Sequence, residues 1–192
     1  MYPIDKHIVV STSGFPADAN MLLDAARTRC QQHTFTFSEP MPVEEVVRYI
    51  CDYKQSYTQF GGSRPFGVAF MYAGFDDNQG FQLYCSDPSG NYAGWKANAT
   101  GVNSVNAISL LKKEYKEGLN LEEGLVLAAK VLTKTLDSAD PGPDRCKYSI
   151  LLLSIVEVLT LTRDGEGVVK HKLLPEGEIK ALLDKVKAQD DN

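Results

Sequence analysis

Near residue 65 the spacing of apolar residues changes, and this change limits the folds that the chain can adopt. Before that point, from about 17 to 33 and from Pro42 to the Gly61-Gly62 pair, apolar residues recur every three to four positions, as on one face of a helix. After it, residues 65–75 and 80–86 are rich in aromatic side chains and have the two-residue period of strands. The pattern predicts two helices followed by a β-hairpin.

Similar reasoning places the other elements. We expect a first strand at 8–12, a third strand over 91–100 passing close under another layer, helices at 104–117 and from about 120, a hairpin of 156–162 with 168–174, and a last helix from Pro175. Blocks of helices thus alternate with blocks of antiparallel strands. This order predicts an α+β fold in which helical layers cover the sheets.

In the first expected helix, Met21, Leu22, Ala25, Ala26 and Arg29 stand at helical spacing. The later helices have stripes that we expect to face the core: Val43, Val46, Val47, Ile50 and Cys51 in the second; Val105, Ile108, Leu111 and Tyr115 in the third; Leu121, Leu125, Ala128, Leu132 and Leu136 in the fourth; and Ile179, Leu182, Leu183 and Val186 in the last. Asn120 and Glu123 have the spacing of a capping box. These stripes are interpreted as core, not as a cofactor site.

Composition excludes several classes of protein. With 192 residues, 43% of them hydrophobic, the chain is long enough to form one domain, 1–192, without metal or disulfide support. A net charge of -5 argues against a general nucleic-acid surface, which needs clustered Lys and Arg. The longest apolar run, 150–155, is far shorter than a membrane span, so we expect no membrane protein. Four separated cysteines and no recognisable signal peptide favour a reducing compartment.

The segment Asp87-Pro88-Ser89-Gly90 has each residue where a type I turn prefers it. Asp stands first, Pro presets the second φ, and Gly is last. A nucleophilic serine of the elbow type would need G-x-S-x-G between a strand and a helix, and neither Ser89 nor Ser63 has that pattern. Ser89 is therefore interpreted as a turn residue.

No other pattern in the chain predicts chemistry. His7 and His171 fall in expected strands and His33 at a helix end, so a shared metal site is not expected. Cys30 and Cys51 belong to helix stripes, where a buried thiol behaves as a small apolar group. Residue spacing thus predicts no catalytic residue, no cofactor site and no metal site.

Two longer stretches carry a family resemblance. YTQFGGSRPFGV (57–68) followed by GFQLYCSDPSGNYAGWKANATG (80–101) strongly resembles the alpha-type subunits of the 20S proteasome core particle, and within them the type-4 group. The resemblance continues through 103–137 and, more weakly, to both ends. It implies an antiparallel β-sandwich between helical layers, the fold of the N-terminal-nucleophile hydrolases and proteasome subunits.

The resemblance also implies a function. Alpha-type subunits form a seven-membered ring that stacks on the catalytic beta ring, meets regulatory particles or activators, and serves ubiquitin-dependent protein degradation in cytoplasm and nucleus. They are scaffold and gate rather than protease. The related beta subunits use an N-terminal threonine as nucleophile, whereas this sequence begins Met1-Tyr2.

Within the matched stretches the resemblance implies structural roles. We expect Gly61, Gly62 and Gly67 to serve backbone geometry at the start of a strand. Arg64 and Pro65 are expected to fix the entry of that strand. Residues 87–90 are expected to turn the chain between two strands of the sheet.

Two departures from the family pattern lead to alternatives. The family's opening helix with its gating tail, its first strands and a lysine of the activator pocket have no counterpart here, so we expect an N-terminally truncated subunit. Residues 146–155 look inserted, either as a strand extension or as a translated intron fragment. The alternatives are a stand-alone N-terminal-nucleophile hydrolase, a truncated isoform that is not incorporated, and an orphan binding module.

Overall fold

The computed structural model describes residues 1–137, 156–165 and 167–190. The chain divides into two compact units, one of residues 1–96 and 161–171 and the other of residues 97–160 and 172–192. Each unit is described here by itself. The proposed insert at 146–155 lies outside the described residues, and the prediction of a single domain over 1–192 stays a prediction.

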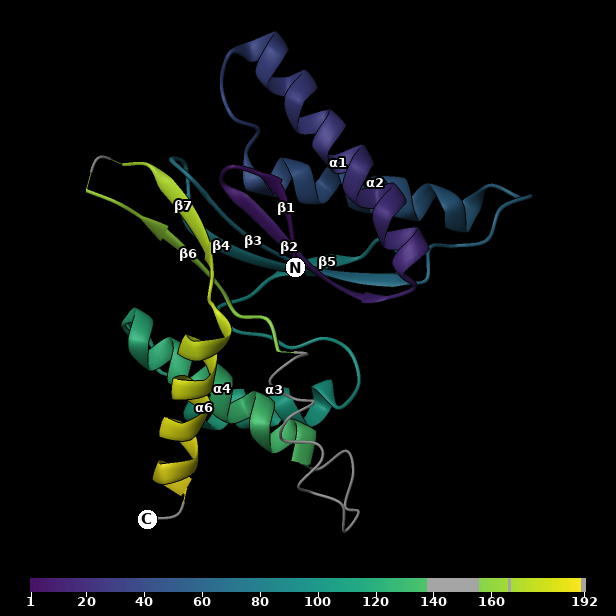
Figure 1. Cartoon of the computed structure of the whole chain (residues 1–192). Coiled ribbons are helices and arrows are strands. Elements are labelled where there is room, and N and C mark those ends of the chain that lie inside the picture. Colours follow the sequence, from purple (N-terminus) through teal and green to yellow (C-terminus); the bar gives the residue numbers. More distant parts are fainter. Residues whose placement is uncertain (138–155, 166, 191–192) are drawn as a thin grey trace. The chain divides into compact units, whose positions relative to one another are not determined.

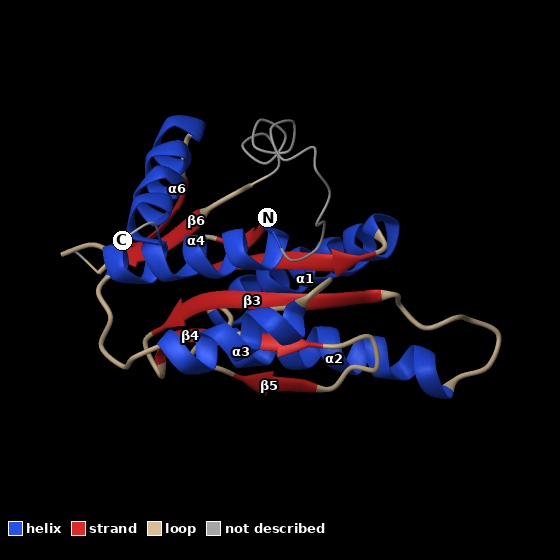
Figure 2. Ribbon diagram, turned by 90° about the horizontal axis from the view of Figure 1, so that it is seen from below, coloured by secondary structure: helices blue, strands red, loops and turns tan. Residues whose placement is uncertain are grey.

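The first unit is built on a five-stranded sheet. Its strands are β1 (Tyr2–Asp5), β2 (Ile8–Gly14), β3 (Val68–Asp76), β4 (Gly80–Ser86) and β5 (Tyr92–Gly94), in that spatial order. All neighbours are antiparallel, with Val10 opposite Tyr72 and Tyr72 opposite Tyr84. The long strand β3 is therefore the centre of the sheet (Figure 2). The predicted hairpin of β3 and β4 is confirmed.

The chain starts with a hairpin rather than with the single strand expected at 8–12. Strand β1 pairs with β2, and the register shifts between Pro3 and Asp5. The Asp5 carboxylate accepts a hydrogen bond from Lys6 N at 2.7 Å within the connecting turn. Four residues with one buried side chain, Ile4, give too short a period-two signal to recognise in the sequence.

Strand β1 forms one edge of this sheet, and a side chain of the covering helix contacts it. Pro3 has no N–H to offer at the edge. Its carbonyl accepts a hydrogen bond from Arg27 Nε at 3.2 Å. The exposed end of the sheet thus has fewer free backbone groups than an ordinary edge strand.

The strand expected over 91–100 is wrong beyond Gly94. Pairing with β4 covers residues 92–94, and one further bond joins Trp95 N to Leu83 O at 2.8 Å. Gly94 does lie close to another side chain, because a Cβ there would be 3.3 Å from the Tyr84 ring. Ala93 and Gly94 are exposed, so no layer covers them. Alternation of small residues was too weak a signal to define the strand end.

Two helices cover one face of the five-stranded sheet (Figure 1). Helix α1 (Pro16–Phe37) has Pro at its first position and ends at Ser38 in a left-handed conformation, φ 59°. Helix α2 (Val43–Gln59) begins after Pro42 with two acidic residues in its first turn, where the helix dipole favours them. Both predicted helices are confirmed, and α1 extends four residues beyond the expected end.

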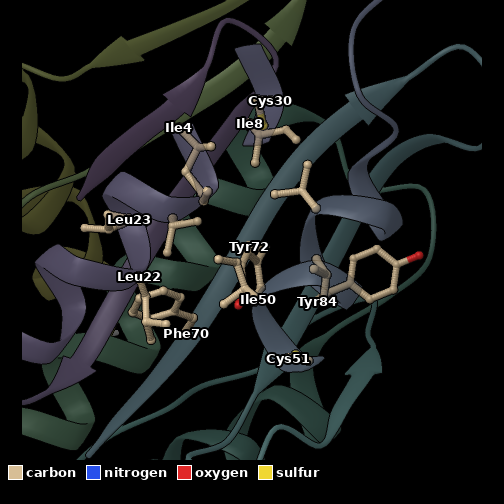
Figure 3. Packing of buried hydrophobic residues seen from close by; sticks show 14 of the residues in the cluster. Ile4, Ile8, Leu22, Leu23, Cys30, Ile50, Cys51, Phe70, Tyr72 and Tyr84 are labelled. Atoms are coloured by element: carbon tan, nitrogen blue, oxygen red, sulfur yellow. The ribbon is translucent and has the colours of Figure 1, made fainter. Parts of the chain in front are cut away.

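The core of the first unit lies between this helical layer and the sheet. Leu22 of α1 and Ile50 of α2 point toward Phe70 and Tyr72 of β3 (Figure 3). The predicted stripe of α2 is confirmed, since Val43, Val46, Val47, Ile50 and Cys51 are all buried. In α1, Met21 and Arg29 are not buried, and the core side is formed by Asp18, Ala19, Leu22, Leu23, Ala26, Cys30 and His33.

The described residues of the second unit form three helices. They are α3 (Ser104–Glu114), α4 (Leu121–Asp137) and α6 (Glu176–Asp190), and α4 contacts both of the others. The predicted capping box starts α4, because Asn120 Oδ1 accepts from Glu123 N and Glu123 Oε2 accepts from Asn120 N, both at 2.9 Å. The buried residues Ala129 of α4 and Ile179, Leu183 and Val186 of α6 form its core.

The stripe predicted for α4 is largely wrong, whereas that of α3 is half-buried except at Val105. Val105 exposes 76% of its surface and Leu121 53%, and Ala128 is exposed as well. Ala107, Ala129 and Val131 are buried instead. A helix that contacts two others on different sides has no single apolar face, so the choice of stripe by periodicity fails. Leu136 lies among the residues whose side chains the structure does not describe.

A hairpin of β6 (Leu159–Arg163) and β7 (Val169–Leu173) completes the fold. Its turn is closed by Asp164 N to Val168 O and by Gly167 N to Asp164 O, both at 3.0 Å, with Gly167 at φ +85°. The hairpin was predicted from the sequence, as was the order of the described elements after β1. Helices with antiparallel sheets confirm the α+β class, whereas the β-sandwich stays a prediction.

Candidate functional site

The two stretches that carry the resemblance meet at one helix. The loop 61–67 leads from α2 into β3, and the turn 87–90 follows β4. Both are joined to the second half of α2 through Lys54, a residue that the sequence analysis did not single out. We therefore build the site from the loop, the turn and this lysine.

Asp18 of α1 holds the loop. Arg64 donates to both Asp18 carboxylate oxygens at 2.6 and 2.7 Å, and Gly67 N donates to one of them at 2.9 Å. The Arg64 hydrogen bonds, followed by the bond from Gly67, lower the pKa of Asp18 to about 2. The predicted role of Arg64 in fixing the strand entry has this physical basis. Asp18 lies 46 positions away, so no spacing signal could have identified it.

The three glycines of the loop 61–67 differ in backbone conformation and in the space around them. Gly62 has φ +93°, a conformation that favours glycine. At Gly67 a Cβ would lie 2.3 Å from the Phe15 ring, so only glycine lets that ring pack there. Gly61 shows neither requirement. Pro65 O accepts a further bond from Arg64 at 3.1 Å. A backbone conformation that favours glycine is thus observed only at Gly62, whereas Gly67 makes room for a side chain.

The predicted turn at Asp87, Pro88, Ser89 and Gly90 is confirmed. Gly90 N donates to Asp87 O at 3.2 Å, and Asp87 Oδ1 accepts from both Ser89 N and Ser89 Oγ, at 2.8 and 2.5 Å. Gly90 has φ +89°, and a Cβ there would lie 2.4 Å from Cys51 O of α2. The turn therefore lies directly against α2, and the Ser89 hydroxyl is engaged within the turn.

Lys54 connects both motifs from inside the protein. Its side chain is fully buried, and Nζ donates to Val68 O at 3.1 Å, to Ser86 Oγ at 2.9 Å and to Asp87 O at 3.4 Å. Val68 directly follows the loop, and Asp87 opens the turn. Nζ also lies 4.6 Å from the centre of the Phe70 ring. One amine thus fixes the start of β3 and the end of β4 relative to α2.

Burial without a carboxylate partner changes the chemistry of this amine. Removal from water disfavours the charged form and lowers the Lys54 pKa to about 8. Ser86 Oγ, its hydrogen-bond partner, lies 3.2 Å from the Tyr72 hydroxyl. A lysine beside a serine has the composition of a base and a nucleophile. Ser86 is only 4% exposed, however, so a substrate carbonyl has no path to its hydroxyl in the folded unit.

The remaining candidates behave as structural residues. Burial raises the pKa of the Cys30 thiol to about 12 and that of Cys51 to about 11, which makes both poor nucleophiles. His7 contacts Met41 O at 2.8 Å and His33 contacts Glu39 O at 3.3 Å, while His171 is exposed. Within the described ranges, no three His, Cys, Asp or Glu side chains are grouped so that they could hold a metal ion.

Whether a helix can span a membrane depends on its length and polarity. In the part of the chain that the structure describes, every helix is too short or too polar to span a bilayer.

The geometry therefore defines an α+β protein whose motif residues stabilise its own scaffold. Comparison with known proteins agrees with this class: the family model described as "Proteasome subunit" matches residues 1–150. The chain belongs to the proteasome subunit family.

Within that family its relatives include alpha type-4 proteins of plants. It is 56% identical to proteasome subunit alpha type-4-A of Arabidopsis thaliana over 80% of this chain and 62% of that protein. It is 46% identical to alpha type-4-2 of Oryza sativa subsp. indica over 96% of this chain and 70% of that protein. Alpha type-4 of Petunia hybrida is 51% identical over 80% of this chain and 62% of the relative. The predicted resemblance to the type-4 group is confirmed.

The length comparison limits what transfers from these relatives. The chain spans 62% of the Arabidopsis relative and 70% of the rice relative. Activity, partners and assembly of a whole alpha subunit are therefore treated as proposals for this chain.

Proposed function

We propose that this chain is a non-catalytic structural subunit of the alpha ring of the 20S proteasome. The observation that carries the proposal is 46% identity over 96% of the chain to a rice protein named proteasome subunit alpha type-4-2. An alignment of 185 residues extends over both units. The function that follows is assembly of a core particle for protein degradation.

The geometry of the motif residues supports a scaffold role. Arg64 is committed to Asp18, and the Ser89 hydroxyl to Asp87. Lys54 and Ser86, the pair closest to a catalytic arrangement, are buried in the core of the first unit. Each polar group of the site stabilises a backbone turn or a strand end, which is what a subunit needs to present fixed surfaces to its neighbours.

The partners follow from the family. We propose other alpha subunits of a seven-membered ring, the beta subunits beneath them, and regulatory particles or activators above, in cytoplasm and nucleus. The sandwich belongs to the same proposal. The face of the sheet opposite α1 and α2 carries Val9, Met71 and Leu83, and we expect a second sheet to cover it.

Co-purification tests assembly. The epitope-tagged chain is expressed in plant cells, core particles are isolated by sedimentation, and tagged protein is quantified in the fractions with peptidase activity. We expect the tag in those fractions. A matched pair of variants checks the site: Gly90→Val, which places a side chain against Cys51 O, should reduce incorporation, whereas Gly124→Ala, with open space around it, should not. Recovery of the parent chain only as monomer or aggregate contradicts the proposal.

Activity of the isolated chain tests the absence of catalysis. The purified chain should not cleave fluorogenic peptides, and Ser86→Ala or Ser89→Ala should leave the peptidase activity of tagged core particles unchanged. Cleavage by the chain alone would contradict the proposal, and a processed N-terminus beginning at Ser, Thr or Cys would then favour the stand-alone N-terminal-nucleophile hydrolase.

A further inference from the structure

The connection between α1 and α2, residues 38–42, contains two prolines (Figure 1). A proline offers no N–H of its own and disfavours the helical conformation in the residue before it. The two residues that precede the prolines are Glu39 and Met41, and both of their carbonyl groups accept from a buried histidine. His33 Nδ1 donates to Glu39 O at 3.3 Å, and His7 Nε2 donates to Met41 O at 2.8 Å. Two side chains from different elements thus hold this connection.

These hydrogen bonds fix which ring nitrogen carries the proton in each neutral histidine. A carbonyl oxygen only accepts, so the proton is on Nε2 of His7 and on Nδ1 of His33, and the other ring nitrogen has a lone pair. In both rings that other nitrogen faces a carboxylate: His7 Nδ1 lies 3.9 Å from Asp5 Oδ2, and His33 Nε2 lies 3.9 Å from Glu45 Oε2. A proton on each ring would turn two facing acceptors into a donor and an acceptor.

The two carboxylates differ in their exposure to water. The side chains of His7 and Asp5 expose only 9% and 12% of their surface, whereas Glu45 exposes 52%. A charge-assisted hydrogen bond between buried groups contributes more than one that solvent screens. Burial by itself disfavours a charged imidazole, so the nearby carboxylate decides whether the ring takes up a proton. The larger effect is therefore expected at His7.

The elements around the two histidines carry other ionisable groups. They are Lys6 of the β1–β2 turn, Arg27, Arg29 and Cys30 of α1, and Asp76 at the end of β3. Burial raises the pKa of the Cys30 thiol to about 12, so it stays neutral. Burial also raises the pKa of Asp76, but four hydrogen bonds outweigh it and the net pKa is lowered, so this group stays ionised. Histidine is the side chain that ordinarily changes charge between pH 5 and 8.

We propose that His7 and His33 form a pH-sensitive clamp on the connection 38–42. At mildly acidic pH each ring binds a second proton, keeps its hydrogen bond to the carbonyl, and donates a second one to its carboxylate. Above neutral pH only the carbonyl bond is left at each histidine. Proton uptake therefore tightens the connection between α1 and α2, chiefly through His7 and Asp5. This property belongs to the folded chain itself and goes beyond the proposed role in assembly.

Amide hydrogen exchange of the isolated full chain measures the clamp. Exchange in peptides that span residues 38–46 is followed by mass spectrometry at pH 8 and pH 5.5, and each rate is divided into the intrinsic rate at the same pH to give a protection factor. We expect the protection factor to be about tenfold greater at pH 5.5, the size expected of one charge-assisted hydrogen bond between buried groups.

Substitutions separate the two carboxylates. Asp5→Asn keeps the shape of the side chain and removes its charge, so it should abolish most of the pH dependence of protection. Glu45→Gln should reduce the pH dependence less, because Glu45 is half exposed. His171→Gln is the matched control, since His171 is exposed and this variant should follow the parent chain. Circular dichroism at both pH values verifies that each variant is folded.

Nitrogen-15 NMR of ring-labelled histidines is the second measurement. At pH 8 we expect the ring proton of His7 on Nε2 and that of His33 on Nδ1. The opposite tautomer at His7 overturns the inference. Protection that falls or stays equal on acidification overturns it too, because the cost of burying the charge then outweighs the carboxylate.

An Asp5→Asn chain with the full pH dependence of the parent also contradicts the clamp, because another group then titrates. If Asp5→Asn does not fold, the tautomers and the pH dependence of the parent chain still decide.

Discussion

The two units of this protein bury their apolar residues in different ways. In the first unit, α1 and α2 both pack on the same face of one sheet, and the core takes side chains from both helices and from four of the five strands. In the second, α4 packs between α3 and α6, and its core has few fully buried residues among those described. A helix on a sheet has one buried face, whereas a helix between helices has two.

The largest expected effect compares the cost of a cavity in each of the two cores. Leu22→Ala in the first unit should lower its free energy of unfolding by about 4 kcal/mol, because Leu22 is fully buried among side chains that cannot collapse around a cavity. Leu183→Ala in the second unit, where the core is small, should cost about 2 kcal/mol. Amide hydrogen exchange reports each unit separately. Equal losses would show that the two cores are packed alike.

The pH dependence of stability tests the buried lysine in the core of the first unit. Lys54 has a pKa of about 8 in the folded protein against an ordinary 10.5. Between pH 8 and pH 10.5 the unfolded chain binds more protons than the folded protein, so the free energy of unfolding rises with pH. Below about pH 8 the amine is charged in both states, and the full destabilisation by the buried charge is present. Relative to Lys54→Met, the parent should gain on the order of 3 kcal/mol from pH 8 to 10.5. Lys112→Met, on an exposed side chain, should leave the pH profile unchanged; a parent curve parallel to that of Lys54→Met contradicts the assignment.

Glycine substitutions are expected to have opposite signs in the two units. Gly90→Ala should destabilise the first unit by about 1 to 3 kcal/mol, since its φ of +89° and the nearby Cys51 carbonyl both oppose a side chain. Gly124→Ala in α4 should stabilise the second unit by about 0.5 to 1 kcal/mol, because nothing surrounds that position and alanine favours helix. Thermal unfolding of both variants gives the signs, and a stabilising Gly90→Ala would refute the role of the turn.

The smallest effect concerns the start of α4. Asn120→Ala removes the acceptor of the Glu123 N–H and should lower stability of the second unit by about 1 kcal/mol. Hydrogen exchange of the first turn of α4 is the measurement. If α4 is unaffected while exchange increases in the first unit, the separation into two units is not supported.

Sequence reasoning predicted the parts of the fold that depend on local patterns. The order of elements after β1, the buried stripe of α2, the capping box and the turn at 87–90 all follow from residues close together in the chain. The stripe of α4 was wrong because periodicity identifies an apolar face but not how many neighbours a helix has.

The same limit applies to the candidate site. The loop and the turn were predicted from their residues, whereas Asp18 and Lys54, which hold them, were missed. Asp18 resembles an ordinary acidic residue in the first turn of a helix, and Lys54 an ordinary polar residue on a helix with an apolar stripe. Their partners lie 46 and 32 positions away, and only the pairing of strands brings those groups together.

The contact between Arg27 and Pro3 has a consequence for a copy of this chain that has not yet met its partners. Copies of a chain with an unpaired edge strand can pair edge to edge and aggregate. At the β1 edge, Pro3 has no N–H to donate, and its carbonyl already accepts a hydrogen bond from Arg27 Nε. Edge-to-edge pairing would therefore lack hydrogen bonds at this residue. The β1 edge is therefore less suited to pairing with a second copy of this chain.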